Sequence, residues 1–408
     1  MNRCARPVVS LTTAMRNASR GTRMYAEGVP AENTKNAVRN AGTGSKKPKV
    51  YSKYNKKKED DDLLPAKVEI KGHSLLRGAR LRRSFLYVPA HKERFLEKAL
   101  TSAADCIVFD LEDGVAPSER KQARENLKNL WKRLGTEGYR PGENRKAELC
   151  LRVNNEGWLG IKNWQKGPNK EVTAPSEELD QDLDLFAFPE VLKVPITVVV
   201  PKANTPYDLR HIREIIFNKQ RKVIDRSRQI KRANVIPTIE TAYAVLNLPL
   251  FSSHQKHFSA LVFAAEDYCA SMGIPRTKDR SNMLFARSSL VHIAKWTGTT
   301  PIDMVCQDFK NLDILKEECE EGVHLGFEGK QAIHPDQIET INKVFSPDPD
   351  EVEWARELLA AVEKNKADGA FEFDGKMVDR PVFRKAENIL EKHKLIEAFE
   401  KDRFASAS

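Results

Sequence analysis

The sequence predicts an α/β protein whose main domain is a (β/α)8 TIM barrel. From Arg83 onward, short apolar runs alternate with amphipathic, helix-like segments, and about eight such pairs fill about 250 residues, the usual size of this barrel. The apolar runs end abruptly in polar residues, as expected of strands that are buried on both faces and meet solvent only at their ends. A doubly wound open sheet is the alternative, but no G-x-G-x-x-G motif follows the first run.

Changes in composition divide the chain into four parts. Residues 1–26 contain five Arg and no acid, which is typical of a mitochondrial transit peptide and predicts a place in the matrix; a merely disordered basic terminus is the alternative. Residues 27–80 are polar and charged and predict a flexible tether. The barrel is assigned to residues 81–345, with an insertion at 155–195, and a C-terminal helix with a lid segment to residues 346–395.

Charge and hydropathy exclude two classes of partner. Of the formal net charge of +10, residues 1–62 carry +8, from 14 Lys and Arg against six Asp and Glu. A nucleic-acid-binding domain carries its basic patch on the folded part, so no nucleic acid is expected. The basic stretch at 213–233 is interpreted as a solvated helix face rather than an RNA site. No apolar run is long enough to span a membrane, so no membrane association is expected.

The six cysteines are scattered and form no C-x-x-C pair. Four of them lie in or beside apolar strands, where a thiol packs like a small hydrophobic side chain. We therefore expect a reducing compartment, without a disulfide framework or a zinc site.

The strands and their polar ends are assigned from the apolar runs. The predicted strands are 84–90, 106–113, 147–154, 197–203, 234–241, 260–267, 303–309 and 329–335. In a barrel the C-terminal ends of all strands form one face, where active sites lie. The polar residues expected there are Asp110, Glu112, Asp113, Arg152, Asn154, Lys202, Glu240, Asp267, Asp308 and His334.

Two of these acids follow neighbouring strands. NVIPTIET ends at Glu240, and after one helical segment ALVFAAEDY ends in Glu266 and Asp267. An acid after a strand is often only the N-cap of a helix. Two acids one βα unit apart can instead converge on a divalent cation, and a site with few carboxylates suits Mg²⁺. With one Arg and one Lys at the same face, this predicts metal-assisted chemistry on an anionic substrate.

Several motifs in the same order identify a family resemblance over residues 82 to about 390. The motifs RRSFLYVPA, FDLEDG, LRVN, VVPKA, IPTIETAYAVLN, FAAEDY, GKQAIHP and GAFEFDGKMVDRP resemble the citrate lyase beta-like branch of the HpcH/HpaI aldolase superfamily. The resemblance implies a TIM barrel that uses Mg²⁺ to make or break a carbon–carbon bond beside a CoA thioester. It also implies a homo-oligomer, commonly a trimer.

The resemblance implies a role for each motif residue. Glu240 and Asp267 would bind Mg²⁺, and Arg152 would hold the carboxylate of the substrate. Asp110, Glu112, Asp113 and Lys202 would support these residues from behind. Asp379 would be the acid/base residue, delivered by the C-terminal lid of an adjacent subunit. The cations expected to bind CoA phosphates are Arg83 and Lys98, with Arg94 beside them.

The expected function is cleavage of a 3-hydroxyacyl-CoA thioester, citramalyl-CoA, to acetyl-CoA and the 2-oxo acid pyruvate. Malyl-CoA cleavage, or condensation followed by thioester hydrolysis, is the alternative, since one methyl group changes binding by only about 1–3 kcal/mol. A weakened homologue that serves as a binding or assembly protein is the alternative from another class. The departures from the family motifs at Ala203, Asn204, Ala244, Ala264 and Ala265 bear on the substrate more than on the metal site.

Overall fold

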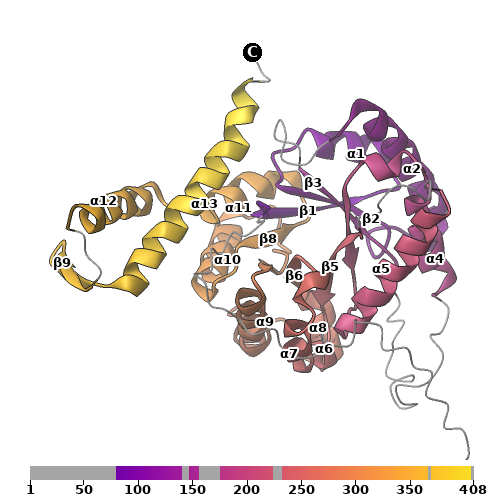
Figure 1. Ribbon diagram of the computed structural model, residues 1–408. Helices are drawn as coiled ribbons and strands as arrows, with labels where there is room; N and C mark the ends of the chain where they lie inside the picture. Colours follow the sequence, from indigo (N-terminus) through magenta and orange to yellow (C-terminus); the bar gives the residue numbers. More distant parts are fainter. Residues whose placement is uncertain (1–79, 140–146, 156–174, 224–231, 366–368, 406–408) are drawn as a thin grey trace, which may run out of the picture. The chain divides into compact units, whose positions relative to one another are not determined.

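The computed structural model describes residues 80–139, 147–155, 175–223, 232–365 and 369–405. Eight parallel strands pair in sequence order, and β1 pairs with β8 to close the barrel (Figure 1). The strands are β1 Ser84–Pro89, β2 Cys106–Asp110, β3 Glu148–Arg152, β4 Ile196–Val200, β5 Asn234–Ile239, β6 Ala260–Phe263, β7 Thr300–Asp303 and β8 Gly329–Ala332. The predicted TIM barrel is confirmed.

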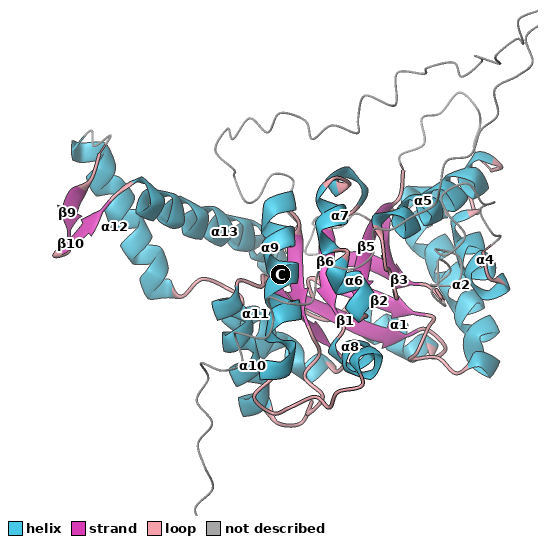
Figure 2. Ribbon diagram, turned by 90° about the horizontal axis from the view of Figure 1, so that it is seen from below, coloured by secondary structure: helices cyan, strands magenta, loops and turns pink. Residues whose placement is uncertain are grey.

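Helices surround the barrel (Figure 2). They are α1 Glu93–Leu100, α2 Arg120–Glu137, α4 Glu177–Leu183, α5 Pro206–Arg221, α6 Ala242–Leu246, α7 Leu248–Ser252, α8 Ala265–Met272, α9 Leu284–Thr297, α10 Leu312–Leu325 and α11 Ile338–Val344. Within the described part of the chain, no helix is both long and apolar enough to cross a membrane.

The strands alternate between two apolar cores, because successive side chains point to opposite faces. One core fills the inside of the barrel and includes Phe85, Val108, Cys150, Val199, Ile236 and Ile302. The other lies between the strands and the surrounding helices. The described cysteines are all buried and free, as their positions in the sequence predict.

The C-terminal segment has a small core of its own. Helix α12 (Pro349–Asn365), the hairpin of β9 (Phe371–Phe373) and β10 (Lys376–Val378), and α13 (Arg380–Ala405) contribute to it. The hairpin turns at Asp374 and Gly375, which both have positive φ, the combination that a type I′ turn requires. At the other end of α13, Glu400 forms an ion pair of 3.3 Å with Arg83 at the start of the barrel.

Every predicted strand runs past the observed C-terminal end, by one to six residues, and three elements differ most. The seventh strand is Thr300–Asp303, so the prediction of 303–309 was displaced. Pro301 is a poor strand signal, but the neighbouring residues on β6 supply the pairing. The sixth strand stops at Phe263, and the acids after it belong to α8. The helix expected after β5 is two short helices, divided at Asn247 before Pro249, which occupies the first turn of α7.

The transit peptide and the tether predicted at 1–26 and 27–80 lie outside the described residues, apart from Arg80. The same holds for residues 156–174 of the predicted insertion. Its described part forms α4 and two short 3-10 helices, Asp184–Phe186 and Val191–Lys193.

Candidate active site

Eight of the ten predicted polar residues gather at the C-terminal ends of strands β2 to β6, and the other two, Asp308 and His334, follow β7 and β8. Asp110 and Arg152 are the last residues of β2 and β3, and Glu240 directly follows β5. Lys202 follows β4 by two residues, and Asp267 lies in the first turn of α8. Because parallel strands end at one edge, side chains far apart in sequence meet here.

Arg152 and Asp110 form a bidentate pair at the centre of this edge. The Nε and Nη2 atoms of Arg152 donate to the two carboxylate oxygens of Asp110, each at 2.7 Å. The guanidinium also lies 4.8 Å from the ring centroid of Tyr87. The backbone N–H of Gly114 donates to Asp110 at 2.9 Å, and a Cβ at Gly114 would lie only 2.3 Å from the same oxygen. The glycine of the FDLEDG motif is therefore required by this close approach.

Glu112 joins this pair to Lys202. Lys202 donates to Glu112 Oε1, and Arg152 Nη1 lies 3.1 Å from Glu112 Oε2. Burial raises the pKa of Glu112 to about 7, in spite of both cations. Lys202 adopts φ 53°, a left-handed conformation that is costly for a residue with a side chain, and such strained residues cluster at active sites. Asp113 is more exposed and lies 3.9 Å or more from both cations.

Glu240 is the least compensated charge of the group. Its side chain is buried, and Thr238 donates a hydrogen bond to its Oε1 atom. Its Oε2 atom is buried and has no hydrogen-bond partner among the described residues. Burial raises the pKa of Glu240 to about 8, and the negative charges of Glu112 and Asp267 contribute to the increase. A buried carboxylate of this kind needs a cation before it can ionise at neutral pH.

The residues present fit a magnesium ion. Glu240 and Asp267 act on one another electrostatically, and the orphaned Oε2 atom of Glu240 offers an unused ligand position. The described residues contain no group of three or more His, Cys, Asp or Glu that could hold a metal. A site with two carboxylates disfavours zinc or a structural cage, whereas Mg²⁺ is commonly bound by one or two carboxylates plus water and substrate oxygens.

Three predicted site residues lie elsewhere. Arg83 is buried at the start of β1, at the opposite end of the barrel, in an ion pair of 2.9 Å with Asp105. Lys98 is exposed in the last turn of α1, which runs from the end of β1 back towards the start of β2. Arg83 precedes a strand and Lys98 ends a helix, so both belong to the N-terminal end of the barrel. Their closeness in sequence to the first motif suggested the opposite end. Asp379 is exposed beside the small C-terminal core.

Helix α4 of the insertion supports the site from behind. The Oδ2 atom of Asp182 accepts hydrogen bonds from the backbone and the side chain of Asn154. The side chain of Asn154 also donates to the carbonyl of Leu111. Arg124 of α2 donates to Asp182 at 2.8 Å. The insertion thus fixes the loops that carry Glu112 and follow Arg152, a role that the sequence did not reveal.

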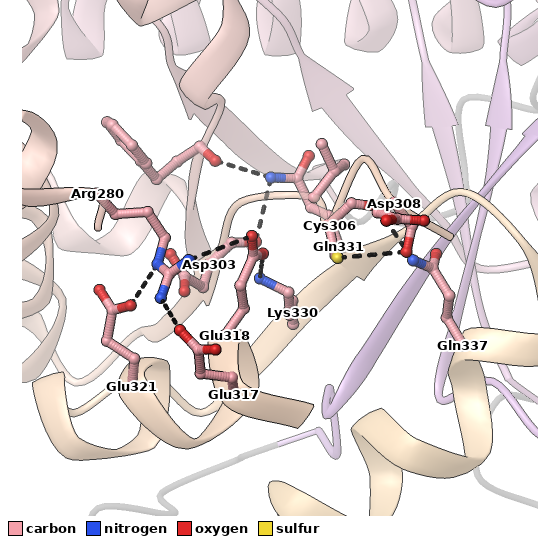
Figure 3. Close-up of polar contacts among 12 residues, drawn as sticks. Arg280, Asp303, Cys306, Asp308, Glu317, Glu318, Glu321, Lys330, Gln331 and Gln337 are labelled. Atoms are coloured by element: carbon pink, nitrogen blue, oxygen red, sulfur yellow. Dashed lines mark hydrogen bonds and ion pairs between the residues drawn. The ribbon is translucent and has the colours of Figure 1, made fainter. Parts of the chain in front are cut away.

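A charged network holds the helix that carries Asp267. Arg276 pairs with Glu266, the neighbour of Asp267, and donates to Glu318 of α10 at 3.1 Å and to the carbonyl of Val305 at 3.0 Å. Figure 3 shows that Lys330 and Arg280 also point at Glu318, with Lys330 Nζ 3.0 Å from it. The first turn of α8 is therefore tied to α10 and to the barrel wall.

Two further residues of the site were missed in the sequence. Tyr87 of β1 stacks on Arg152, and Thr238 of β5 holds Glu240. Each follows the two-residue period of its strand: Tyr87 shares the inner face with Phe85, and Thr238 the face of Glu240. Tyr87 lies two residues before Pro89, the last residue of β1, and Thr238 lies two residues before Glu240, so the strand period was the signal that could have found them.

The family model for HpcH/HpaI aldolase/citrate lyase matches residues 83–335, more than half of the chain. The chain belongs to this family. It is 32% identical over 322 residues to the mitochondrial citramalyl-CoA lyase of Mus musculus, an alignment that covers 76% of this chain and 85% of the relative. It is also 32% identical over 319 residues to the (3S)-malyl-CoA thioesterase of Cereibacter sphaeroides, covering 78% and 96%.

A solved structure has a fold similar to that of this chain. It is the CitE protein of Mycobacterium tuberculosis in complex with magnesium, acetoacetate and coenzyme A. The TM-score is 0.57 at 26% identity, with 76% of this chain and 97% of that chain covered. The chain is therefore an enzyme of a lyase family, and magnesium occurs in a related structure.

Proposed function

We propose that the protein is a magnesium-dependent carbon–carbon lyase that cleaves citramalyl-CoA to acetyl-CoA and pyruvate. The observation that carries this proposal is the buried Oε2 atom of Glu240, which has no hydrogen-bond partner among the described residues. Beside Asp267, it provides a place for a divalent cation at the expected face of the barrel. The substrate is inferred from the relatives that carry the name citramalyl-CoA lyase.

The reaction moves one proton and one electron pair. The hydroxyl of the substrate loses its proton, and the bond between the hydroxyl-bearing carbon and the carbon next to the thioester breaks. The electron pair passes to the thioester side as an enolate, which takes up a proton at carbon to give acetyl-CoA. Mg²⁺ held by Glu240 and Asp267 would supply Lewis-acid stabilisation of the charge on the 2-oxo acid oxygens.

Arg152 would orient the carboxylate of the substrate with a part of its guanidinium only. Its Nε atom and one N–H of Nη2 are used by Asp110. Its Nη1 atom faces Glu112 at 3.1 Å. The remaining N–H groups of the two terminal nitrogens are the donors for substrate, while Asp110 and Tyr87 hold the plane of the guanidinium. Asp110 is therefore a positioning residue for Arg152.

The acid/base residue would be Asp379 of a second copy in a homo-oligomer, with a trimer as the state that the family resemblance implies. In its own chain Asp379 is exposed beside a separate small core, and the adjacent Met377 is 73% exposed. Such a segment has the chemistry of a lid that covers another subunit and excludes water. The location would be the mitochondrial matrix, on the composition of residues 1–26 and the naming of the relatives.

For CoA, the geometry disfavours Arg83 and Lys98, which belong to the N-terminal end of the barrel. Arg94 lies in the first turn of α1, shortly after the C-terminal end of β1. We assign the phosphates of CoA to Arg94 rather than to the other two.

The first test is the release of acetyl-CoA from citramalyl-CoA by the purified full chain, with Mg²⁺ and with EDTA. We expect turnover that needs the metal and that is lost in Glu240→Gln. Glu339→Gln on α11 serves as the control for a neutral substitution of an exposed acid. If folded protein with Mg²⁺ releases no acetyl-CoA, the lyase proposal fails and a binding role takes its place.

Mixing two inactive variants tests the lid. Glu240→Gln lacks a metal ligand but has an intact lid, and Asp379→Asn has the reverse. If the lid acts on a neighbour, random mixed oligomers of a cyclic assembly regain about one quarter of the wild-type activity, because one site in four combines both intact parts. If each lid serves its own chain, mixing restores none.

Cleavage of malyl-CoA, with hydrolysis of the thioester, is the second candidate. It is favoured by the 32% identity to (3S)-malyl-CoA thioesterase. Two readouts separate the candidates: the ratio of kcat/KM values for citramalyl-CoA and malyl-CoA, and the appearance of free thiol from malyl-CoA. Release of CoA thiol without acetyl-CoA would assign the thioesterase reaction.

A further inference from the structure

At the N-terminal end of the barrel, a group of basic residues has few acidic partners among the described residues, and Glu214 pairs with one of them. It consists of Arg210 and Arg213 of α5, Arg232 before β5, and His254 and His257 beside the short 3-10 helix Gln255–His257. We call these five residues the basic cluster. The cluster lies before strands β5 and β6, because Arg213 Nε donates to the carbonyl of Ala233, one residue before β5.

Among the described residues, Arg213 has no acidic partner. Its Nε atom is used by Ala233, and its terminal nitrogens have no hydrogen bond or ion pair among the described residues. Burial and the nearby Arg232 lower the pKa of Arg213. Every other described arginine whose pKa departs from the usual value has it raised by a carboxylate partner, for example Arg287 by Asp303. In the described part of the chain, those arginines have carboxylate partners and Arg213 has none.

Burial and the same excess of positive charge lower the pKa of His257. Its Nδ1 atom is buried without a hydrogen-bond partner in the described part of the chain. Burial lowers its pKa to about 4, together with Arg213, His254, Arg210 and Arg232. Among the described residues, the acid in contact with the cluster is Glu214, which already pairs with Arg210 at 3.1 Å. The imidazole therefore stays neutral although an anion at this point would favour its charged form.

Aromatic rings hold the cations in place. The guanidinium of Arg232 lies 5.4 Å from the ring centroid of Phe217, and that of Arg221 lies 5.8 Å from the same ring. The rings of His254 and His257 are 5.8 Å apart, and the half-exposed Tyr207 lies 5.4 Å from His254. Arg210, Arg213, Phe217 and Arg221 share one face of α5, at spacings of three and four residues. These ring contacts hold the basic side chains at fixed positions, unlike the mobile side chains of a solvated helix face.

We propose that the basic cluster binds the phosphate group of an anionic ligand, at the end of the barrel opposite to the active site. The unpaired terminal nitrogens of Arg213 match the fork geometry by which arginine binds phosphate oxygens. Arg232 and the two histidines add further donors, and Arg213, Arg232 and His254 are all near enough to His257 to lower its pKa. The exposed ring of Tyr207 at the border offers a stacking surface if the phosphate belongs to a nucleotide. This proposal does not depend on the proposed lyase activity.

The pKa of His257 gives a local readout. The full chain is titrated by NMR of the histidine ring protons, with His257→Gln to assign the signal, in chloride buffer and then with pyrophosphate at constant ionic strength. We expect pyrophosphate to raise the pKa of His257 by about one unit or more, because an opposite charge nearby favours the charged imidazole. An unchanged pKa would overturn the proposal.

Thermal unfolding tests the same site independently and distinguishes the sources of phosphate. Inorganic phosphate, pyrophosphate and ADP are compared at matched ionic strength in wild type and in Arg213→Gln. We expect pyrophosphate to raise Tm by about 2 °C or more in wild type and by much less in the variant. Lys316→Gln, which removes one exposed cation from α10, is the matched control and should retain the full shift.

The comparison of ligands identifies the occupant. A larger shift with ADP than with pyrophosphate, reduced by Tyr207→Ala, assigns a nucleotide; equal shifts assign a free phosphate. Shifts of the same size in wild type, Arg213→Gln and Lys316→Gln would show general screening of charge and would contradict a built site.

Discussion

Two buried charge networks, one at each end of the barrel interior, differ in how far their charges are neutralised. At the N-terminal end, Glu148 of β3 accepts hydrogen bonds from Arg82, Arg80 and Thr197. Arg82 also donates to the carbonyl and the hydroxyl of Ser259. Against the effect of burial, Arg82 and Arg80 lower the pKa of Glu148 to about 2. The charges inside this end neutralise one another.

At the C-terminal end, acids outnumber the cations that reach them. Burial raises the pKa of Glu240 to about 8, and one of its oxygens has no hydrogen-bond partner among the described residues. Glu112 shares its two cations with Asp110 and Asp113. A completed network stabilises a fold, whereas an incomplete one marks a site that is finished by a ligand. The network around Glu148 inside the barrel is therefore structural, whereas the network around Glu240 is a functional site; the basic cluster is separate from both and lies on α5 and before β5.

The largest effect is expected for Glu240→Gln. The variant should lose lyase activity by about 10³-fold, since it removes one of two carboxylates for a metal that contributes several kcal/mol to the transition state. Without metal it should unfold at the same or a higher urea concentration than wild type, because a buried, uncompensated acid is removed. Steady-state kinetics and urea unfolding in EDTA measure both. A strongly destabilised apo-variant would break the comparison.

Glu148→Gln should show the reverse. The substitution leaves Arg82 buried without its full partner, which costs about 3–5 kcal/mol. We expect this loss in urea unfolding at pH 7, with the kcat of the protein that remains folded close to that of wild type. Glu125→Gln, in an exposed ion pair with Lys128 on α2, is the control and should change stability by less than about 0.5 kcal/mol. A similar loss of unfolding free energy in both variants would show that the buried pair of Glu148 and Arg82 contributes no more than an exposed one.

The stabilisation by Glu148 should depend on pH. Its pKa is about 2 in the folded protein, below the ordinary value of 4.5, so its contribution is present above the unfolded pKa and is lost as pH falls through the folded pKa. A difference of this size corresponds to about 3 kcal/mol. The difference in unfolding free energy between wild type and Glu148→Gln should therefore shrink by about 3 kcal/mol between pH 5 and pH 2. Parallel pH profiles of the two proteins would contradict this mechanism.

A smaller effect is expected from the network behind α8. Arg276→Gln removes the link between Glu266 and Glu318, and should weaken Mg²⁺ binding by about tenfold through the position of Asp267. Titration calorimetry of the apo-protein with MgCl₂ measures this without turnover. Arg280→Gln, which faces Glu317, Glu318 and Glu321 but no residue of α8, should bind Mg²⁺ nearly as wild type. Equal losses in both variants would assign the effect to stability alone.

The sequence by itself determined the barrel and most of the site. Strands that are buried on both faces are continuous apolar runs, so their ends in Asp110, Arg152 and Glu240 were visible without a structure. Period-two alternation also places Tyr87 two residues before the end of β1 and Thr238 two residues before Glu240. These features depend on neighbours along the chain, and local sequence reports them.

Tertiary structure decided which end of the barrel each charge serves. Arg83 precedes β1 and Lys98 ends α1, so proximity to a motif did not place them at the active face. The support of Asn154 by Asp182, and the absence of an acid for Arg213 among the described residues, join segments that are distant in sequence. Whether a buried charge is neutralised depends on all side chains that surround it, and only the closed barrel brings them together.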